Sequence, residues 1–438
     1  MLSVTRSGLG PEPVAPARRR SRGTPRRLTT PVWKFGGSSL ATTERVRAAA
    51  RRAGAAYRSG GPLAVVVSAQ GDTTDALLSR AADVGSTAAG RELDQLLATG
   101  ENASAALMAI ALQGLGVPAV AVTGSQSGIL ATGRHGTGVV VAVDPERILR
   151  VLDGGKVAVV AGFQGTNEEG DVITLGRGGS DSSAAALAAG LGAHDCDILT
   201  DVAGVYTADP RICPSAQLMP VVPNDVMAEM AFAGARVMHT RAVEIAALHD
   251  VELRVRSSFE QTPGTRIPLR GDGGMVETVP AAWAVVHDLD VARVELSAGG
   301  AGGATVADLY RRLARRGITV DMVGSARDGR GGLTSGMTVR RSDVPEVRRA
   351  LERVAGPSRG RVVVDEEVAR VSVVGTGLLS RPEYTARMLS CLRTAGIEAS
   401  ALSTSQARIC VTVPSASATL AVRRLHQEFG LDGARNDQ

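Results

Sequence analysis

The stretch DVITLGRGGSDSSAAALAAG, residues 171–190, carries a run of β-forming residues through a glycine-rich turn into an Ala-rich helix. Val172–Leu175 predict a strand, and Ser180 or Asp181 is well suited to cap the helix that follows. The three glycines predict a backbone nest that favours anions. Capping leaves Arg177 unexplained, and its fork of donors could hold a carboxylate or a phosphate. Asp181 is a candidate for orienting a lysine or a magnesium-bound phosphate.

The sequence around this turn repeats one pattern. Short β-runs alternate with Ala-rich helical stretches from residue 31 to about residue 270. Such alternation is typical of an α/β sandwich around a mainly parallel sheet. Ligands of these sheets collect at the carboxyl ends of the strands, where we expect the functional loops.

The pattern changes after a Gly- and Pro-rich segment, which we expect to be a linker and place at residues 266–284. Two weakly similar units follow within residues 285–438, each in the order strand, helix, strand, strand, helix. This repeated βαββα order predicts two small α/β units packed together.

The composition excludes several classes of protein. Hydrophobic residues make up 44% of the 438 positions, yet no apolar run approaches the roughly 18–20 residues that span a bilayer, so we expect a soluble protein without a membrane partner. Aromatic residues make up only 3%, which is poor for stacking on nucleic-acid bases. Four cysteines without a close pair indicate neither a zinc site nor disulfides, and favour the reducing cytoplasm.

The net charge of +5 belongs to the amino-terminal tail. Residues 1–30 hold seven Arg and one Glu, so the remaining chain is nearly neutral. Pro, Gly and Arg with little apolar content predict a disordered extension. An upstream start codon, an organellar targeting peptide or a polyanion-binding arm are the alternatives.

The segment VWKFGGSSL places Lys34 on a strand and Gly36, Gly37 and Ser38 before a helix. The glycines let a ligand approach the backbone, and the helix N-terminus and the lysine favour negative charge. This pattern predicts a phosphate cradle, although a plain turn is the alternative. The common nucleotide-binding fingerprints are absent from the sequence.

Two further segments carry polar side chains in suggestive places. TDVAGVYTADPR, residues 200–211, offers an aromatic face, polar groups and a cation, or is an ordinary Asp-Pro turn. Glu101, at the start of an apolar helical run, is either an acid that satisfies the helix dipole or a receptor for an ammonium group.

Together these segments resemble the aspartate kinases of the amino-acid kinase family, over essentially the whole chain after residue 30. The motifs that carry the resemblance are KFGGSSL, SAQGDTTDALL, RELDQLLATGE, TGSQSGI, RHG, GFQGTN, TLGRGGSDSSAAALAAGL, TDVAGVYTADPR and RVRSSF.

The resemblance implies a three-layer α/β kinase domain at residues 31–265, followed by tandem ferredoxin-like ACT domains that bind amino-acid effectors. It implies phosphoryl transfer from ATP, with Mg²⁺ carried by the ATP, to the side-chain carboxylate of L-aspartate, a first step toward lysine, threonine and methionine. It also implies a homo-oligomer formed through the ACT domains.

The resemblance further implies roles for single residues. The catalytic residues would be Lys34, Asp181 and Arg236. The residues that bind aspartate would be Thr74, Glu101, Arg134, Arg177 and Ser180. The residues that bind ATP would be Lys34, Gly36, Gly37, Ser38, Thr200, Asp201, Tyr206, Asp209, Arg211 and Arg236. No residue is assigned to a metal.

Some positions depart from the family pattern. Arg236 replaces a lysine, Gln70 a methionine and Asn102 an arginine. The effector loops also differ, with SAGGAGGAT at residues 297–305 in place of an Asp-x-Pro-Gly turn. We therefore expect weakened or altered feedback control, as in a copy dedicated to one pathway.

Two other functions remain open at this point. One is a kinase of a related amino acid on the same fold. The other is a non-catalytic ACT-bearing amino-acid sensor, against which the presence of Lys34, Arg177 and Asp181 argues. Nucleic-acid binding through the Arg-rich tail is a weak third idea.

Overall fold

The structure is a computed structural model of the chain. It describes residues 30–85, 90–269, 281–298, 302–327, 333–355 and 361–433. The predicted disordered tail lies outside the described residues apart from residue 30, as do the centre of the predicted linker and the middle of the SAGGAGGAT loop.

The centre of the first half is a seven-stranded sheet in the order β11-β10-β9-β1-β2-β6-β3. All neighbouring pairs are parallel except β10 with β11, which is antiparallel. The strand bounds are β1 Val32–Phe35, β2 Ala64–Val67, β3 Ala119–Val122, β6 Val157–Ala161, β9 Asp195–Thr200, β10 Glu252–Ser257 and β11 Thr265–Ile267. The predicted mainly parallel α/β sheet is therefore confirmed.

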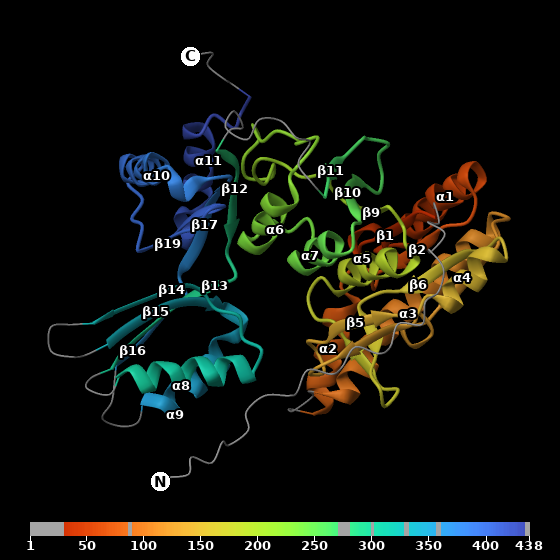
Figure 1. Cartoon of the computed structure of the whole chain (residues 1–438), viewed down its shortest axis with the longest axis horizontal. Helices are drawn as coiled ribbons and strands as arrows, with labels where there is room; N and C mark the ends of the chain where they lie inside the picture. Colours follow the sequence, from red (N-terminus) through yellow and green to blue (C-terminus); the bar gives the residue numbers. More distant parts are fainter. Residues whose placement is uncertain are drawn as a thin grey trace, which may run out of the picture.

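Helices cover both faces of this sheet, which makes three layers (Figure 1). Alternate residues of a strand point to opposite faces, and β2 shows the result. Val65 belongs to the apolar cluster that includes residues of α1 and α3, whereas Val66 belongs to the cluster that includes residues of α4, α5, α6 and α7. The helix bounds are α1 Thr43–Gly60, α3 Arg91–Gly114, α4 Glu146–Asp153, α5 Gly179–Leu191, α6 Asn224–Ala233 and α7 Thr240–Leu248.

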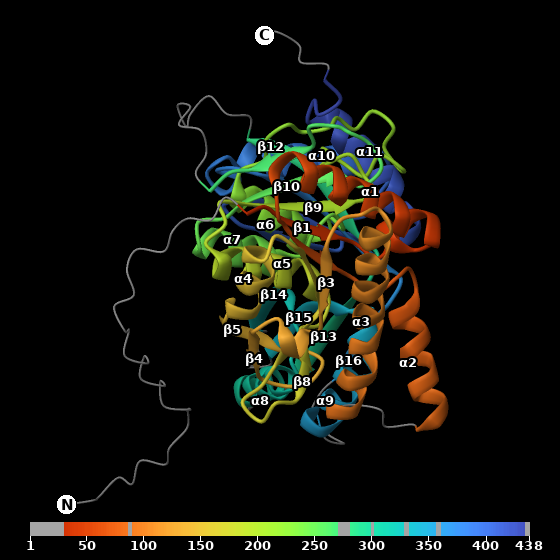
Figure 2. The same cartoon turned by 90° about the vertical axis from the view of Figure 1, so that its right-hand side faces the viewer.

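A small sheet in the order β5-β4-β7-β8 lies beside the main sheet, and β8 leads into the glycine turn that precedes α5. Its strands are β4 Ile129–Thr132, β5 Val139–Val143, β7 Gln164–Thr166 and β8 Val172–Thr174. Helix α2, Thr73–Val84, projects next to α3 (Figure 2).

The second half consists of two four-stranded antiparallel sheets with two helices each. The first unit has the sheet order β14-β15-β13-β16. Its elements are β13 Val291–Ala298, α8 Gly302–Arg315, β14 Asp321–Arg327, β15 Leu333–Arg340, α9 Val344–Ala355 and β16 Arg361–Asp365. The repeated βαββα order is thus found, with β16 added as a fourth strand.

The second unit has the sheet order β12-β17-β19-β18, and its first strand comes from before the first unit. Its elements are β12 Ala282–Asp288, β17 Val368–Gly375, α10 Pro382–Thr394, β18 Ala401–Thr404, β19 Arg408–Pro414 and α11 Ala418–Glu428. β12 begins inside the segment expected to be a linker and pairs antiparallel with β17. The first unit is therefore inserted into the second.

Candidate active site

The predicted phosphate cradle lies at the carboxyl ends of β1, β2 and β9. The amide of Gly36 donates to the Leu199 carbonyl at 3.2 Å, which ties the turn after β1 to the end of β9. A Cβ atom on Gly37 would lie 2.7 Å from the Ala69 carbonyl oxygen, so this close approach requires glycine. Ser38 then begins a short 3₁₀ helix, Ser38–Leu40.

Lys34 and Asp181 form an ion pair at the centre of this region. The Lys34 Nζ atom lies 2.6 Å from Asp181 Oδ1, and the two side chains are only 11% and 9% exposed. The other carboxylate oxygen of Asp181 accepts a hydrogen bond from the His239 amide at 3.2 Å. The structure thus brings together a strand lysine and a helix carboxylate that lie 147 positions apart in the sequence.

The glycine turn does not use a side-chain cap. Helix α5 begins at Gly179, and Gly178 is its N-cap with φ 64°. The expectation that Ser180 or Asp181 caps the helix is therefore wrong. A Cβ atom on Gly178 would lie 2.1 Å from the Cβ of His239, so only glycine fits there. Because the cap is glycine, the Asp181 carboxylate is left for Lys34.

The sequence analysis missed two residues that hold this turn from the side of α7. His239 packs against Gly178, and Arg241 donates to the carbonyl of Leu175 at 2.7 Å and to the carbonyl of Gly138 at 2.8 Å. Burial lowers the pKa of Arg241. The polar His239-Thr240-Arg241 triplet at the start of an apolar helical stretch was the available signal.

Asp94 was missed as well, although it is almost fully buried in α3. Its carboxylate accepts from His135 Nδ1 at 2.9 Å, from the Gly136 amide at 3.0 Å, and from the amide and hydroxyl of Thr174 at 2.8 and 2.7 Å. It therefore joins α3 to the RHG loop and to the strand before Arg177. No helix was predicted at this position, so the sequence offered no local signal for it.

Glu101 is 3% exposed and lies on α3 near the cradle. Its Oε1 atom accepts from the Ala69 amide at 3.0 Å. Among the residues that the structure describes, Oε2 has no hydrogen-bond partner. Burial raises the pKa of Glu101 to about 7, against the opposing effect of the Ala69 amide. A buried carboxylate oxygen without a donor suits an incoming ammonium group.

Three predicted site arginines make contacts on the side of the ACT units rather than at the Lys34–Asp181 pair. Their side-chain contacts are Arg134 with the Arg315 carbonyl at 3.1 Å, Arg177 with Asp290 at 3.6 Å and Arg236 with Asp288 at 4.0 Å. Arg177 and Arg236 are 61% and 70% exposed, so both side chains have room to move.

The predicted nucleotide loop follows β9. Thr200 donates to Asp201 at 3.1 Å, and Tyr206 pairs with Leu218 as an isolated bridge. Asp209 and Arg211 form an ion pair at 2.7 Å. The hydrogen bond from Arg211 lowers the pKa of Asp209.

The remaining predicted positions lie around the cradle. Thr74 is half-buried in the first turn of α2, and Ser180 is buried against Gly162. Of the departures from the family, Gln70 donates from Nε2 to the Leu40 carbonyl at 2.9 Å. The Oδ1 atom of Asn102 is buried, and within the described part of the chain it has no hydrogen-bond partner.

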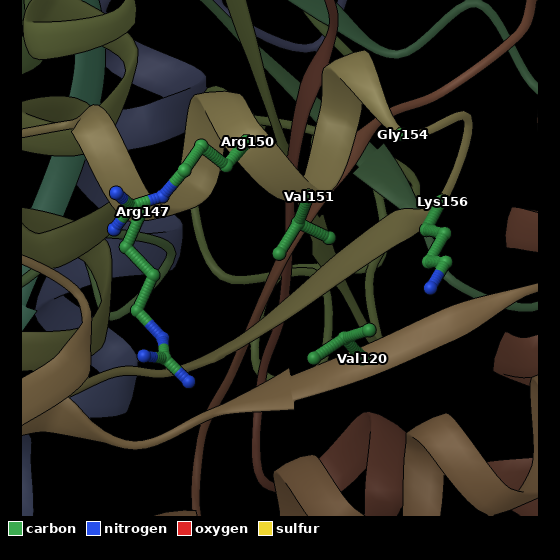
Figure 3. A pocket seen from close by; sticks show the side chains of 6 residues that line it. All are labelled: Val120, Arg147, Arg150, Val151, Gly154 and Lys156. Atoms are coloured by element: carbon green, nitrogen blue, oxygen red, sulfur yellow. The ribbon is translucent and has the colours of Figure 1, made fainter.

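A hollow of about 230 Å³ lies elsewhere, against the edge strand β3 and the end of α4. Figure 3 shows the side chains that line it. Its lining residues are Val120, Arg147, Arg150, Val151, Gly154 and Lys156. Two strands separate β3 from β1, so this hollow is separate from the Lys34–Asp181 pair.

Within the described ranges, no group of three or more His, Cys, Asp or Glu side chains could hold a metal, and no helix is long and apolar enough to cross a membrane.

Comparison with known proteins gives consistent matches. The model of the amino acid kinase family matches residues 29–257, and an ACT domain model matches residues 371–429. An aspartokinase of Thermus thermophilus is 42% identical over 405 residues, which cover 92% of this chain and 99% of the relative. An aspartokinase of Corynebacterium efficiens is 42% identical over 412 residues, covering 92% and 96%.

Two solved structures have a similar fold. Aspartokinase III of E. coli in complex with aspartate and ADP has a TM-score of 0.75 at 23% identity, covering 91% of this chain and 99% of that one. Aspartate kinase from Synechocystis has a TM-score of 0.51 at 35% identity, covering 92% and 69%.

Proposed function

The chain belongs to the aspartokinases of the amino acid kinase family, and from that membership we propose how its residues perform the reaction. It is an aspartate kinase, which transfers a phosphoryl group from ATP to the side-chain carboxylate of L-aspartate. Both reactants are anions, so positioning and charge neutralisation supply most of the catalysis, without a covalent enzyme intermediate.

The single observation that carries the proposal is the buried Lys34–Asp181 ion pair beside the Gly36-Gly37 turn. Lys34 and the backbone of the turn hold the transferring phosphoryl group, and Asp181 keeps the Lys34 ammonium aimed at it. A lysine held at a glycine turn supplies donors and positive charge where negative charge develops.

The aspartate subsite is proposed to lie between Glu101 and Arg177. The free Oε2 atom of Glu101 receives the α-ammonium group, and the Arg177 fork holds a carboxylate after it leaves Asp290. Thr74, Arg134 and Ser180 add hydrogen bonds around the same substrate.

The nucleotide subsite is proposed to consist of the loop after β9 together with Arg236. Tyr206 offers an aromatic face, and Thr200, Asp201, Asp209 and Arg211 offer polar groups. Mg²⁺ is expected to arrive with ATP and to neutralise its phosphates. The glycine cradle, in which Gly37 leaves no room for a Cβ atom beside the Ala69 carbonyl oxygen, is the feature of this chain that suits the phosphates.

We further propose that the protein is a cytoplasmic homo-oligomer that associates through its ACT units. The proposed domains are the kinase domain at residues 31–265, the linker at residues 266–284 and the ACT units at residues 285–438. The four cysteines are free, and three are buried. The ACT units are proposed to bind an amino-acid effector with altered feedback, since their loops depart from the family pattern. Inhibition by lysine plus threonine at millimolar or lower concentration, as in an ordinary family member, would contradict altered feedback.

The test is an ATP-dependent acyl-phosphate assay with hydroxylamine as the trap. We expect product from L-aspartate and little from L-glutamate or other amino acids. The matched control is the Lys34→Gln variant, which should form product at least about a hundredfold more slowly than the wild-type chain. No product from aspartate with the wild-type chain would overturn the proposal.

A further inference from the structure

The proposed nucleotide loop is built into the core of the second ACT unit. Ala208 and Cys213 are buried in one apolar cluster with residues of β12, β17 and α11. On the surface of the same contact, the Arg423 guanidinium of α11 donates to the Ile212 carbonyl. The loop that follows a kinase strand therefore takes its shape from the regulatory half of the chain (Figure 1).

Thr207 is the point at which this loop meets three other segments. Its amide donates to the Gln217 carbonyl at 2.9 Å, and its carbonyl accepts from the Val285 amide of β12 at 2.8 Å. Its hydroxyl lies 2.8 Å from His426 Nε2, 2.9 Å from the Gln217 amide and 3.3 Å from the Leu431 carbonyl. Thr207 is 8% exposed and His426 is 1% exposed.

The donor and acceptor roles of the groups around the Thr207 hydroxyl follow from the hydrogens and lone pairs that each group has. A threonine hydroxyl has one hydrogen to donate and two lone pairs to accept with. The Gln217 amide can only donate, and the Leu431 carbonyl can only accept. The hydroxyl therefore donates to Leu431, and its second lone pair accepts from His426, whose Nε2 carries the hydrogen. Burial lowers the pKa of His426.

We propose that His426 is a positioning residue for nucleotide binding. Through the Thr207 hydroxyl it holds the loop in the shape that presents Tyr206, Asp209 and Arg211 to the nucleotide. His426 itself does not touch the nucleotide. The inference rests on the proposed assignment of this loop to ATP, and it adds that a side chain on helix α11 of the ACT unit sets the affinity for ATP.

The position of the Thr207–His426 hydrogen bond predicts a selective effect on the binding of nucleotide. Thr207 is hydrogen-bonded to β12 and α11, whereas Glu101 lies on α3. Loss of the Thr207–His426 hydrogen bond should therefore weaken the binding of nucleotide and leave the binding of aspartate unchanged. A general loss of folding would weaken both.

The experiment uses the full chain and two matched pairs of variants. His426→Leu removes the hydrogen bond between the imidazole and Thr207, and Thr207→Val removes all three contacts of the hydroxyl. Thr207→Ser and His426→Gln keep a hydroxyl and an N–H donor at nearly the same places. We expect His426→Leu to raise the KM for ATP and the Kd for Mg-ADP in calorimetry by about tenfold, the effect of one lost hydrogen bond, and Thr207→Val to raise them by at least as much. The KM for aspartate should stay within about twofold.

The conservative variants should restore most of the nucleotide affinity. Arg424→Gln, at an exposed position on the same helix, is the control that should behave like wild type. Equal rises in the KM values for ATP and for aspartate, or an unchanged Mg-ADP affinity in Thr207→Val, would overturn the inference. The proposed function would still hold in that case, provided that the wild-type chain phosphorylates aspartate. A wild-type chain that neither phosphorylates aspartate nor binds Mg-ADP would overturn both.

Discussion

The guanidinium of Arg177 lies 3.6 Å from the carboxylate of Asp290, which stands between β12 and β13 at the entrance to the ACT units. The arginine proposed to hold the substrate carboxylate therefore already has a carboxylate partner. On that proposal, substrate and Asp290 would compete for one cation, and the contact would lower the apparent affinity for aspartate by the stability of the ion pair.

Replacing Asp290 by Asn should remove this competition. Because Arg177 is well exposed, the pair is weak, and we expect the KM for aspartate to fall only about two- to fivefold. Steady-state kinetics at low and high salt would check this, since salt should reduce the difference. The control is Asp308→Asn, which removes another exposed pair on α8. An unchanged KM in Asp290→Asn would contradict the competition.

Arg177→Ala should raise the KM for aspartate much more than the KM for ATP. We expect a rise of at least about tenfold, because a bidentate charged contact is lost. Kinetics with each substrate varied in turn separates the two effects. If the affinity for ATP alone collapsed, the assignment of Arg177 to aspartate would be wrong.

The Lys34–Asp181 pair should be needed for both activity and folding. Lys34→Gln or Asp181→Asn leaves one nearly buried charge without its partner, which should cost about 3–5 kcal/mol in the free energy of unfolding. Both should lower kcat by about a hundred- to a thousandfold. Urea denaturation and kinetics would measure this. The double variant should recover much of the stability but none of the activity, and recovered activity would contradict the proposed role.

Glu101 should make aspartate binding depend on pH near neutrality. Its pKa is raised to about 7, so the carboxylate becomes protonated as the pH falls below 7 and can no longer attract an ammonium group. We expect the KM for aspartate to rise about tenfold from pH 8 to pH 6. Glu101→Gln should have a high KM that no longer varies over this range, and a retained pH dependence in that variant would rule out Glu101 as the titrating group.

The same shift predicts an effect on stability with a defined sign. Because the folded-state pKa of Glu101 lies above the ordinary value of 4.5, the stability from its protonated form is fully present below about pH 4.5 and is lost as the pH rises through 7. Glu101→Gln should therefore melt at a higher temperature than wild type at pH 8. The difference should vanish toward pH 4.5, as thermal denaturation at several pH values would show.

Asp321 of β14 should be essential for joining the first ACT unit to the second. Its carboxylate binds Arg408 at 2.8 and 2.9 Å and Arg370 at 2.6 Å, and Arg408 also pairs with Glu229 of α6. Burial alone would raise the pKa of Asp321, but the two arginines outweigh it and lower the pKa. Asp321→Ala leaves two largely buried guanidinium groups without this partner and should cost about 3–5 kcal/mol. A loss as small as that of the exposed Asp308→Asn control would contradict this.

The sequence was sufficient to predict the main sheet, because its buried strands and Ala-rich helices alternate locally along the chain. Local signals made Asp181 a candidate for orienting a lysine, but they did not identify Lys34 as that lysine, because the two residues lie 147 positions apart. The N-cap was mispredicted because the packing of His239 on Gly178, 61 positions away in the chain, decides which residue fits.

Other features depend on how distant segments meet, and no local pattern encodes this. Asp94 collects donors from two loops, and Arg134, Arg177 and Arg236 contact residues of the ACT side rather than the cradle. The pairing of β12 with β17 was missed for the same reason, because some 80 residues of chain separate the two strands.

Because of that pairing, the first ACT unit is one continuous insertion that could be deleted as a single segment. Asp288 at the end of β12 lies opposite Arg370 near the start of β17, so the chain leaves the second unit and returns to it at one place. A short hairpin turn between these two points could replace the whole first unit without rerouting any other strand. Such a trimmed chain would separate what the first unit contributes from the anchoring of the nucleotide loop by α11.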